Sequence, residues 1–300
     1  MPNSRILILA LFALALVVFG LGLMFMLQAN QTEFDGQRAL ADADYQMALG
    51  PRVPESEAHE AAVQWMSDSL IAAGWEVEIQ QAEALGHPLS NVIATRGSGS
   101  PWIILGAHYD SRIYADKDAD PAGRELPVPG ANDGASGVAV LLELARSLPP
   151  DLRAQIWLVM FDAEDNGGIP GWDWILGSRA FAESLQEQPD AVVIVDMIGD
   201  SDLQIYFEAN SDVTLREQIW ATAAELGLGS VFINEVRHSM LDDHTPFLQL
   251  GIPAVDIIDF DYPYWHTRAD TLDKISAESL NAVGDTLMAW LLCQANGDCE

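Results

Sequence analysis

Regular alternation of apolar strands and helices constrains the fold of this chain more than any other feature of its sequence. Short apolar runs predict buried strands at residues 102–106, 156–161, 191–195 and 254–258. Helical periodicity separates these runs, most clearly at 137–147, 178–185, 212–226 and 276–292. Chains of this kind form a largely parallel sheet that helices cover on both faces. We therefore predict a single α/β domain with a mostly parallel, mixed central sheet.

The N-terminus carries a second strong signal, an uninterrupted apolar run at residues 6–27 that follows Arg5. At about 1.5 Å per residue this run is long enough to cross a hydrocarbon core of roughly 30 Å. A cleaved signal peptide has a shorter apolar region, so we predict an uncleaved transmembrane helix. The position of Arg5 leaves the N-terminus in the cytoplasm and the remaining chain outside it. Residues 1–29 are thus predicted as a cytoplasmic stub and a single-pass membrane anchor.

The remaining boundaries follow from where the regular pattern starts and stops. Residues 30–54 carry no sustained periodicity and are interpreted as a juxtamembrane linker. A helix is predicted to begin after Ser56, a favoured N-cap residue, and to stop before Gly74. Further β-like segments lie at 76–79, 91–95 and 203–207. We predict a folded domain at 55–293 and a C-terminal tail at 294–300.

Charge and cysteine content exclude several classes of function. The chain has 45 acidic and 14 basic residues, a net charge of −31, which repels phosphate backbones and makes nucleic acid an unsuitable partner. Cys293 and Cys299 are the only cysteines, so a cysteine-based zinc cluster and a dense disulfide scaffold are both excluded. The sequence leaves open whether these two cysteines pair with each other.

Imidazole and carboxylate groups follow the predicted strands at the points where the strands end. One more acid, Asp133, lies in the glycine-rich turn at 130–134 just before a helix. The groups that follow strands are His108, Asp110, Asp162, Glu164, Asp165, Asp196 and, after a loop, His266. Ligands of α/β sheets bind at the carboxyl ends of the strands, and so many carboxylates would repel one another without a cation. Histidine nitrogens and carboxylate oxygens are ligands of zinc, so we predict a zinc site at this edge.

These residues belong to motifs that resemble a known family. The motifs are His-Tyr-Asp-Ser at 108–111, Gly-Ala-Asn-Asp-Gly-Ala-Ser-Gly at 130–137, Phe-Asp-Ala-Glu-Asp at 161–165, Val-Asp-Met-Ile-Gly at 195–199 and Trp-His-Thr at 265–267. Their order and spacing over residues 45–293 are similar to those of the zinc aminopeptidase and glutaminyl-peptide cyclotransferase superfamily. The resemblance implies a bacterial-type zinc-exopeptidase fold, also described as phosphorylase/hydrolase-like, for a catalytic domain at 55–293.

Roles for individual residues are implied by the same resemblance. Glu164 would be the general acid/base, and Asp242 would hydrogen-bond with Glu164 and Asp196. Asp133 would bridge when two zinc ions are present rather than one. The implied metal ligands are His108, Asp133, Asp165, Asp196 and His266, and the implied residues of the substrate pocket are Trp172, Trp265 and His244. Family members often have glutamate where this chain has Asp165, which shortens that ligand by one methylene.

Two reactions are possible on this scaffold. We expect a zinc-dependent aminopeptidase that hydrolyses the N-terminal residue from peptides with a free N-terminus. The alternative is a glutaminyl-peptide cyclotransferase that forms N-terminal pyroglutamate. The segment Asp-Asp-His-Thr-Pro-Phe at 242–247 resembles the carboxyl-terminal third of the cyclases, although Asp256 stands where cyclases usually have histidine. A remote alternative is a non-catalytic ectodomain, whose mark would be the loss of ligands.

Overall fold

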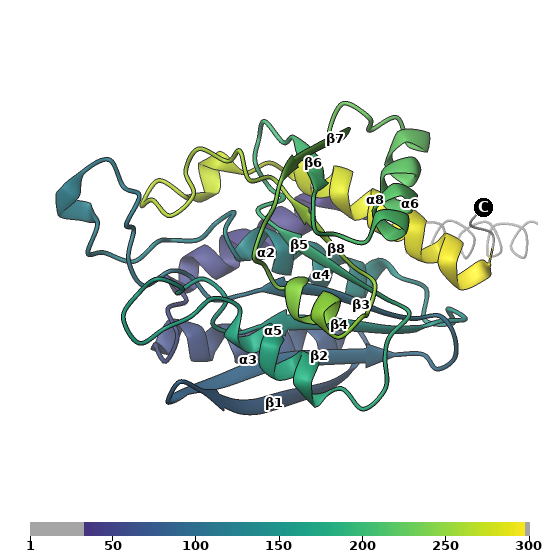
Figure 1. Ribbon diagram of the computed structural model, residues 1–300, viewed down its shortest axis with the longest axis horizontal. Coiled ribbons are helices and arrows are strands. Elements are labelled where there is room, and N and C mark those ends of the chain that lie inside the picture. Colours follow the sequence, from purple (N-terminus) through teal and green to yellow (C-terminus); the bar gives the residue numbers. More distant parts are fainter. Residues whose placement is uncertain (1–32, 298–300) are drawn as a thin grey trace, which may run out of the picture.

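The computed structural model describes residues 33–297, and in this part of the chain a six-stranded sheet forms the centre of the molecule (Figure 1). Its strand order is β1-β2-β4-β3-β5-β8. Strands β3, β4, β5 and β8 run parallel, whereas β2 is antiparallel to both β1 and β4. The bounds are β1 Glu76–Ala84, β2 His87–Arg96, β3 Trp102–His108, β4 Gln155–Phe161, β5 Ala191–Asp196 and β8 Ala254–Ile258. The mixed sheet predicted from the sequence is confirmed.

Strand register brings the carboxyl ends of the parallel strands to one edge. His108 at the end of β3 pairs with Phe161 at the end of β4, and Asp196 at the end of β5 pairs with Ile258 at the end of β8. These strands are short and apolar, and β5 and β8 are buried along their whole length. Their polar residues therefore collect where the strands stop and the chain turns.

Helices cover both faces of the sheet, as the sequence predicts. One face packs against α2 Gly36–Leu49, α3 Glu57–Ala72, α4 Ala135–Ser147 and α8 Ala277–Asn296. The other face carries the short helices α5 Leu176–Ser184 and α7 Thr245–Gln249. Phe181 of α5 and Phe247 of α7 meet Phe161 of β4 there, with ring centroids 5.6 to 6.2 Å apart. Two short 3-10 helices, η1 Pro121–Gly123 and η2 Leu272–Lys274, lie in the loops.

A smaller unit stands beside the main sheet at its β8 edge. Strand β6 Ile205–Glu208 pairs in parallel with β7 Phe232–His238, and helix α6 Val213–Glu225 connects them. Trp220 of α6 is buried between Phe207 and Phe232, with ring centroids 5.1 and 5.2 Å away. Strand β7 was not predicted, because four of its seven residues are exposed and it lacks a clear apolar alternation.

The segment interpreted as a linker contains a helix that belongs to the folded domain. Asp35 caps α2 by accepting hydrogen bonds from the backbone N–H groups of Gln37 and Arg38. Gln46 reaches from α2 to the carbonyl of Ala135, at a distance of 3.1 Å. The domain therefore begins near residue 34, about twenty residues earlier than predicted.

The ends of the chain bear on the predicted anchor and tail. The predicted span at 6–27 lies outside the described residues, and within 33–297 no helix has the length and apolar character needed to cross a bilayer. At the other end α8 continues to Asn296, beyond the predicted start of the tail. Cys293 lies in α8 and is disulfide-bonded.

Candidate active site

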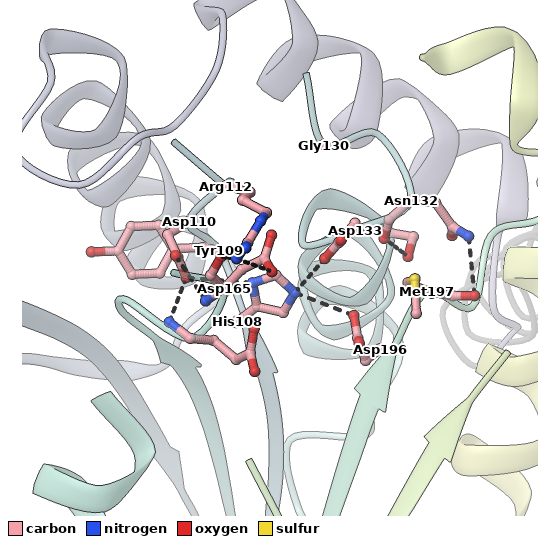
Figure 2. Close-up of polar contacts among 12 residues, drawn as sticks. His108, Tyr109, Asp110, Arg112, Gly130, Asn132, Asp133, Asp165, Asp196 and Met197 are labelled. Atoms are coloured by element: carbon pink, nitrogen blue, oxygen red, sulfur yellow. Dashed lines mark hydrogen bonds and ion pairs between the residues drawn. The ribbon is translucent and has the colours of Figure 1, made fainter. Parts of the chain in front are cut away.

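Two groups of three ligand-type side chains meet at the carboxyl edge of the sheet. His108, Asp133 and Asp196 form one group, and Asp133, Asp165 and His266 form the other. Within each group the ligand atoms lie within 4.8 Å of one another, and all five residues are buried. Figure 2 shows His108 between Asp133 and Asp196, with its imidazole directed at both carboxylates. All five predicted metal ligands are thus brought together.

Asp133 belongs to both groups through different oxygens. Its Oδ1 lies 3.1 Å from Nε2 of His108, and its Oδ2 lies 3.9 Å from Nε2 of His266. The same imidazole nitrogens face one further carboxylate each, with Asp196 Oδ1 at 3.2 Å from His108 and Asp165 Oδ1 at 2.7 Å from His266. One carboxylate therefore stands between two separate pairs of ligands, as a bridging ligand does.

The electrostatics of the cluster fit a bound cation. Burial raises the pKa of Asp165 to about 6, and the neighbouring charge of Asp133 adds to this effect. Burial also raises the pKa of Asp196 to about 7, against the hydrogen bond with His108. Among the described residues, Asp133 Oδ2 and Asp165 Oδ2 are buried and have no hydrogen-bond partner. Two histidines and three carboxylates are a donor set that zinc accepts, and its positive charge would offset the crowding of the acids.

Asp110 holds two parts of the site in a fixed relation. Its carboxylate accepts hydrogen bonds from the backbone N–H of Glu164 at 2.9 Å and of Asp165 at 3.3 Å. The side-chain amide of Asn166 donates to the same carboxylate at 3.2 Å. Because Asp110 follows β3 and the other residues follow β4, this carboxylate ties the loop after one strand to the loop after the next.

A second buried carboxylate, that of Asp270, holds the turn that carries Asp133. It accepts hydrogen bonds from the backbone N–H of Asn132 at 2.9 Å and of Asp133 at 3.1 Å. Tyr262 donates its hydroxyl to Asp270 at 2.7 Å. Sequence reasoning missed Asp270. Its place four residues after His266, next to a Trp-His-Thr motif, was the only signal that could have drawn attention to it.

Backbone conformation at the site is unusual. Ala163, Met197 and His266 have positive φ angles of 50°, 47° and 56°, a region that residues other than glycine rarely adopt. Each of them is a ligand or lies close to one in sequence. The imidazole of His266 stacks on Trp265 with centroids 3.7 Å apart and lies 6.0 Å from the ring of Trp174. Packing on two indoles fixes the ring orientation that this strained backbone sets up.

A cavity of about 210 Å³ opens beside the ligand cluster and contains both predicted catalytic acids, Glu164 and Asp242. Burial raises the pKa of Glu164 well above its ordinary value, and the charge of Asp242 raises it further. Burial also raises the pKa of Asp242. The rest of the lining is largely apolar, and its side chains other than acids are Trp174, Met197, Met240, Leu241, Ile258, Phe260 and Trp265.

Of the three predicted pocket residues, one lies where the resemblance implies. Trp265 lines the cavity. Trp172 instead stacks on His87, with ring centroids 3.6 Å apart, and Trp174 occupies the cavity wall. His244 is fully buried behind the wall. Trp172 and Trp174 lie in the same loop, and no periodicity of the sequence indicates which of the two faces the cavity. Trp174 was therefore not predicted as a pocket residue.

Glu208 organises the buried region around His244. Its carboxylate accepts from the backbone N–H groups of Asn210, Ser211 and Met240, and from the hydroxyl of Ser211, at distances between 2.7 and 3.0 Å. Nε2 of His244 lies 3.3 Å from Glu208, and Nδ1 lies 3.8 Å from Asp256. Met240 belongs to the cavity wall, so Glu208 supports that wall from behind.

This chain is similar to proteins of known structure and to curated proteins. A zinc-dependent exopeptidase from Parabacteroides distasonis has a solved structure with 31% sequence identity, a TM-score of 0.82, and coverage of 87% of this chain and 99% of its own. A glutaminyl cyclase from Bacteroides thetaiotaomicron bound to N-acetylhistamine also has 31% identity and a TM-score of 0.82, and covers 87% and 98%. Glutaminyl-peptide cyclotransferase from Gloydius blomhoffii is 27% identical and covers 83% of this chain and 79% of its own.

The family is shown by a direct match over most of the domain. Residues 91–291 match the description of peptidase family M28, and this range contains all five ligand-type residues and Glu164. The resemblance stated from the motifs is therefore confirmed, and the family together with its zinc-dependent neighbour implies zinc as the metal. The chain belongs to peptidase family M28.

Proposed function

We propose that this chain is an aminopeptidase that binds two zinc ions and hydrolyses the N-terminal peptide bond of peptides with a free N-terminus. The observation that carries the proposal is the position of Asp133. Its two carboxylate oxygens face two separate histidines, which is the arrangement that a pair of bridged metal ions requires.

The residues of the cavity supply the remaining chemistry. Zinc, when bound, would polarise the scissile carbonyl group and activate a water molecule. Glu164 would take a proton from the attacking water and return it to the leaving amine, and its raised pKa suits both steps. Asp242 adds a second acid to the same cavity, whose oxygens could accept hydrogen bonds from the α-amine of a substrate. The apolar wall would hold the side chain of the first residue.

Glutaminyl cyclisation is the second candidate, and the pairing of Glu164 with Asp242 favours it. In that reaction the α-amine attacks the γ-amide carbon, ammonia leaves, and no water is consumed. Two neighbouring acids could accept the proton from the amine and deliver it to the ammonia. The cyclase relatives support this candidate, whereas the equal TM-scores of the exopeptidase and the cyclase favour neither reaction.

One experiment distinguishes the candidates. The purified chain is loaded with zinc, its metal content per chain is measured, and it is given an aminoacyl chromogenic substrate and, separately, a peptide with N-terminal glutamine. We expect two zinc ions and release of the first residue. Loss of 17 mass units from the glutaminyl peptide, with ammonia and no free amino acid, would establish cyclisation instead. Zinc-loaded chain without either activity would favour a non-catalytic ectodomain.

We also propose that the domain is extracytoplasmic and anchored by residues 6–27. The length of the apolar run and the position of Arg5 support this orientation, and a disulfide at Cys293 is typical of an oxidising compartment. Membrane fractionation with protease protection tests it. Full-length chain in the soluble fraction, or a mature N-terminus near residue 30, would contradict the proposal.

A further inference from the structure

We infer that Arg52 is a positioning residue of the metal centre, because its guanidinium joins the loop that directly follows His108 to the loop that carries Asp133. The inference rests on the proposed zinc site but not on which reaction the site performs. Arg52 lies between α2 and α3, outside the residues 91–291 that match the family.

The contacts of Arg52 all go to the backbone of these two loops. Nε donates to the carbonyl of Tyr109 at 3.1 Å, and Tyr109 directly follows His108. Nη1 donates to the carbonyl of Pro129 at 2.9 Å, and Nη2 donates to that of Gly130 at 2.6 Å. The carbonyl of Arg52 accepts from the backbone N–H of Ser111 at 3.1 Å, which adds a fourth link to the first loop.

Burial makes these hydrogen bonds matter more. The side chain of Arg52 is fully buried, and its hydrogen-bond acceptors among the described residues are backbone carbonyls, not carboxylates. Burial lowers the pKa of Arg52 to about 10, so the guanidinium stays charged at neutral pH. A buried charge without a paired acid is costly unless hydrogen bonds satisfy it. Here the three carbonyl oxygens satisfy it, and the guanidinium in turn prevents them from being left without partners.

The three hydrogen bonds of Arg52 require the planar, forked shape of a guanidinium group. Gly130 has a φ of +75°, and a Cβ atom at this position would lie 2.7 Å from Nη2 of Arg52, so the turn packs directly on the guanidinium. Gly130 opens the turn that ends in Asp133. An arginine can donate in three directions from fixed positions, whereas a lysine ammonium donates from one atom and cannot reach both loops in the same way. The positive charge also lies close to an acid-rich cluster, whose members Asp270, Asp110 and Asp133 act on it electrostatically.

The chain offers a matched control in Arg96. Its guanidinium also donates to three backbone carbonyls, those of Ala73, Ala145 and Leu148, and it lies over the ring of Trp75. These groups belong to α3, α4 and their ends, away from the ligands. Arg96 is less buried than Arg52 but makes the same kind of contact without touching a ligand loop, so its loss has no direct route to the metal centre.

The experiment compares Arg52→Lys and Arg52→Gln with Arg96→Lys and Arg96→Gln in the full-length chain. For each protein the zinc dissociation constant is measured by competition with a chromophoric chelator, and the melting temperature of the metal-free form is measured separately. Supporting residues of metal ligands typically contribute 10- to 100-fold to affinity. We expect the Arg52 variants to bind zinc 10- to 100-fold more weakly, with Lys less affected than Gln. The Arg96 variants should lose melting temperature while their affinity stays within about threefold of the parent.

Several results would overturn the positioning role of Arg52. Parent-like zinc affinity in the Arg52 variants would overturn it, and so would an equal loss of affinity in Arg96 variants of the same metal-free stability. An Arg52→Lys protein that cannot fold, beside an Arg96→Lys protein that does, would make Arg52 a requirement of the fold and would also overturn it. If the parent chain itself bound no zinc, the proposed function would fail at its metal site, which is a distinct result.

Discussion

Replacing Glu208 by glutamine should destabilise the fold strongly and in a pH-dependent way. In the native structure both carboxylate oxygens of Glu208 accept hydrogen bonds, from Asn210, Ser211 and Met240, and His244 lies within ion-pair distance. A glutamine side chain has one oxygen and one NH₂ group. The NH₂ group would face backbone donors, so at least one buried N–H would lose its acceptor.

The size of the expected destabilisation follows from the pKa of the Glu208 carboxyl. Burial raises it, but the nearby imidazole of His244 and the backbone hydrogen bonds outweigh burial and lower the pKa of Glu208 from 4.5 to about 2. At about 1.36 kcal/mol per unit, this shift corresponds to roughly 3 kcal/mol of stability at pH 7. Because the folded pKa is depressed, the contribution is complete above pH 4.5 and is lost as the pH falls toward 2. At pH 3 about 1.4 kcal/mol should remain.

The assay is urea unfolding of metal-free protein at pH 7 and pH 3, with Glu217→Gln as the control. Glu217 lies exposed on α6 in the same small unit, and its replacement should change the free energy of unfolding by less than about 0.5 kcal/mol. A loss below 1 kcal/mol for Glu208→Gln at pH 7 would refute the reasoning. An equal loss at both pH values would show that charge plays no part in it.

Three further predictions concern the site and its surroundings. Glu164→Gln should lower kcat by about 10²- to 10⁴-fold with zinc content unchanged, whereas Asp165→Asn should lose zinc first; equal zinc loss in both, measured by metal analysis, would contradict these roles. Trp174→Ala should raise KM by about tenfold, a loss near 1.4 kcal/mol, while Trp172→Ala, which alters a ring outside the cavity, should leave KM unchanged in steady-state kinetics. Burial lowers the pKa of His59, but the hydrogen-bonded carboxylate of Asp162 raises it more, so the folded-state pKa is raised. This pair therefore stabilises the fold fully below about pH 6.5 and less as the pH rises past the raised pKa. The difference in unfolding free energy between the parent and His59→Gln should shrink from pH 6 to pH 9, and a constant difference would exclude the effect.

The sequence predicted the sheet edge well because its signal is local. Each parallel strand is an apolar run that stops at a polar residue, and parallel register alone then brings His108, Asp165 and Asp196 together. The placement of these three residues follows from strand ends and needs no knowledge of side-chain packing, whereas Asp133 and His266 come from other segments. The sequence could not predict that the two oxygens of Asp133 face different histidines. This depends on the orientation of a turn whose backbone donates hydrogen bonds to Asp270.

The features that the sequence did not predict have a different physical origin. Helix α2 buries small residues such as Ala39 and Ala43 and no large apolar side chain, so it shows no strong apolar stripe. Its place in the fold comes from packing against α4 and α8, which are far from it in sequence. Arg52 and Glu208 were missed for a similar reason, since each acts through backbone groups that no spacing rule connects to it.

The hydrogen bonds of Asp110 have a consequence for which parts of this site can change independently. Its carboxylate holds the backbone N–H groups of Glu164 and Asp165, which follow β4, beside the segment that follows β3 and His108. The cavity wall comes from other segments, which carry Leu241, Phe260 and Trp265. Substitutions in the wall can therefore change the shape of the cavity while the backbone of Glu164 and Asp165 keeps its position beside the end of β3.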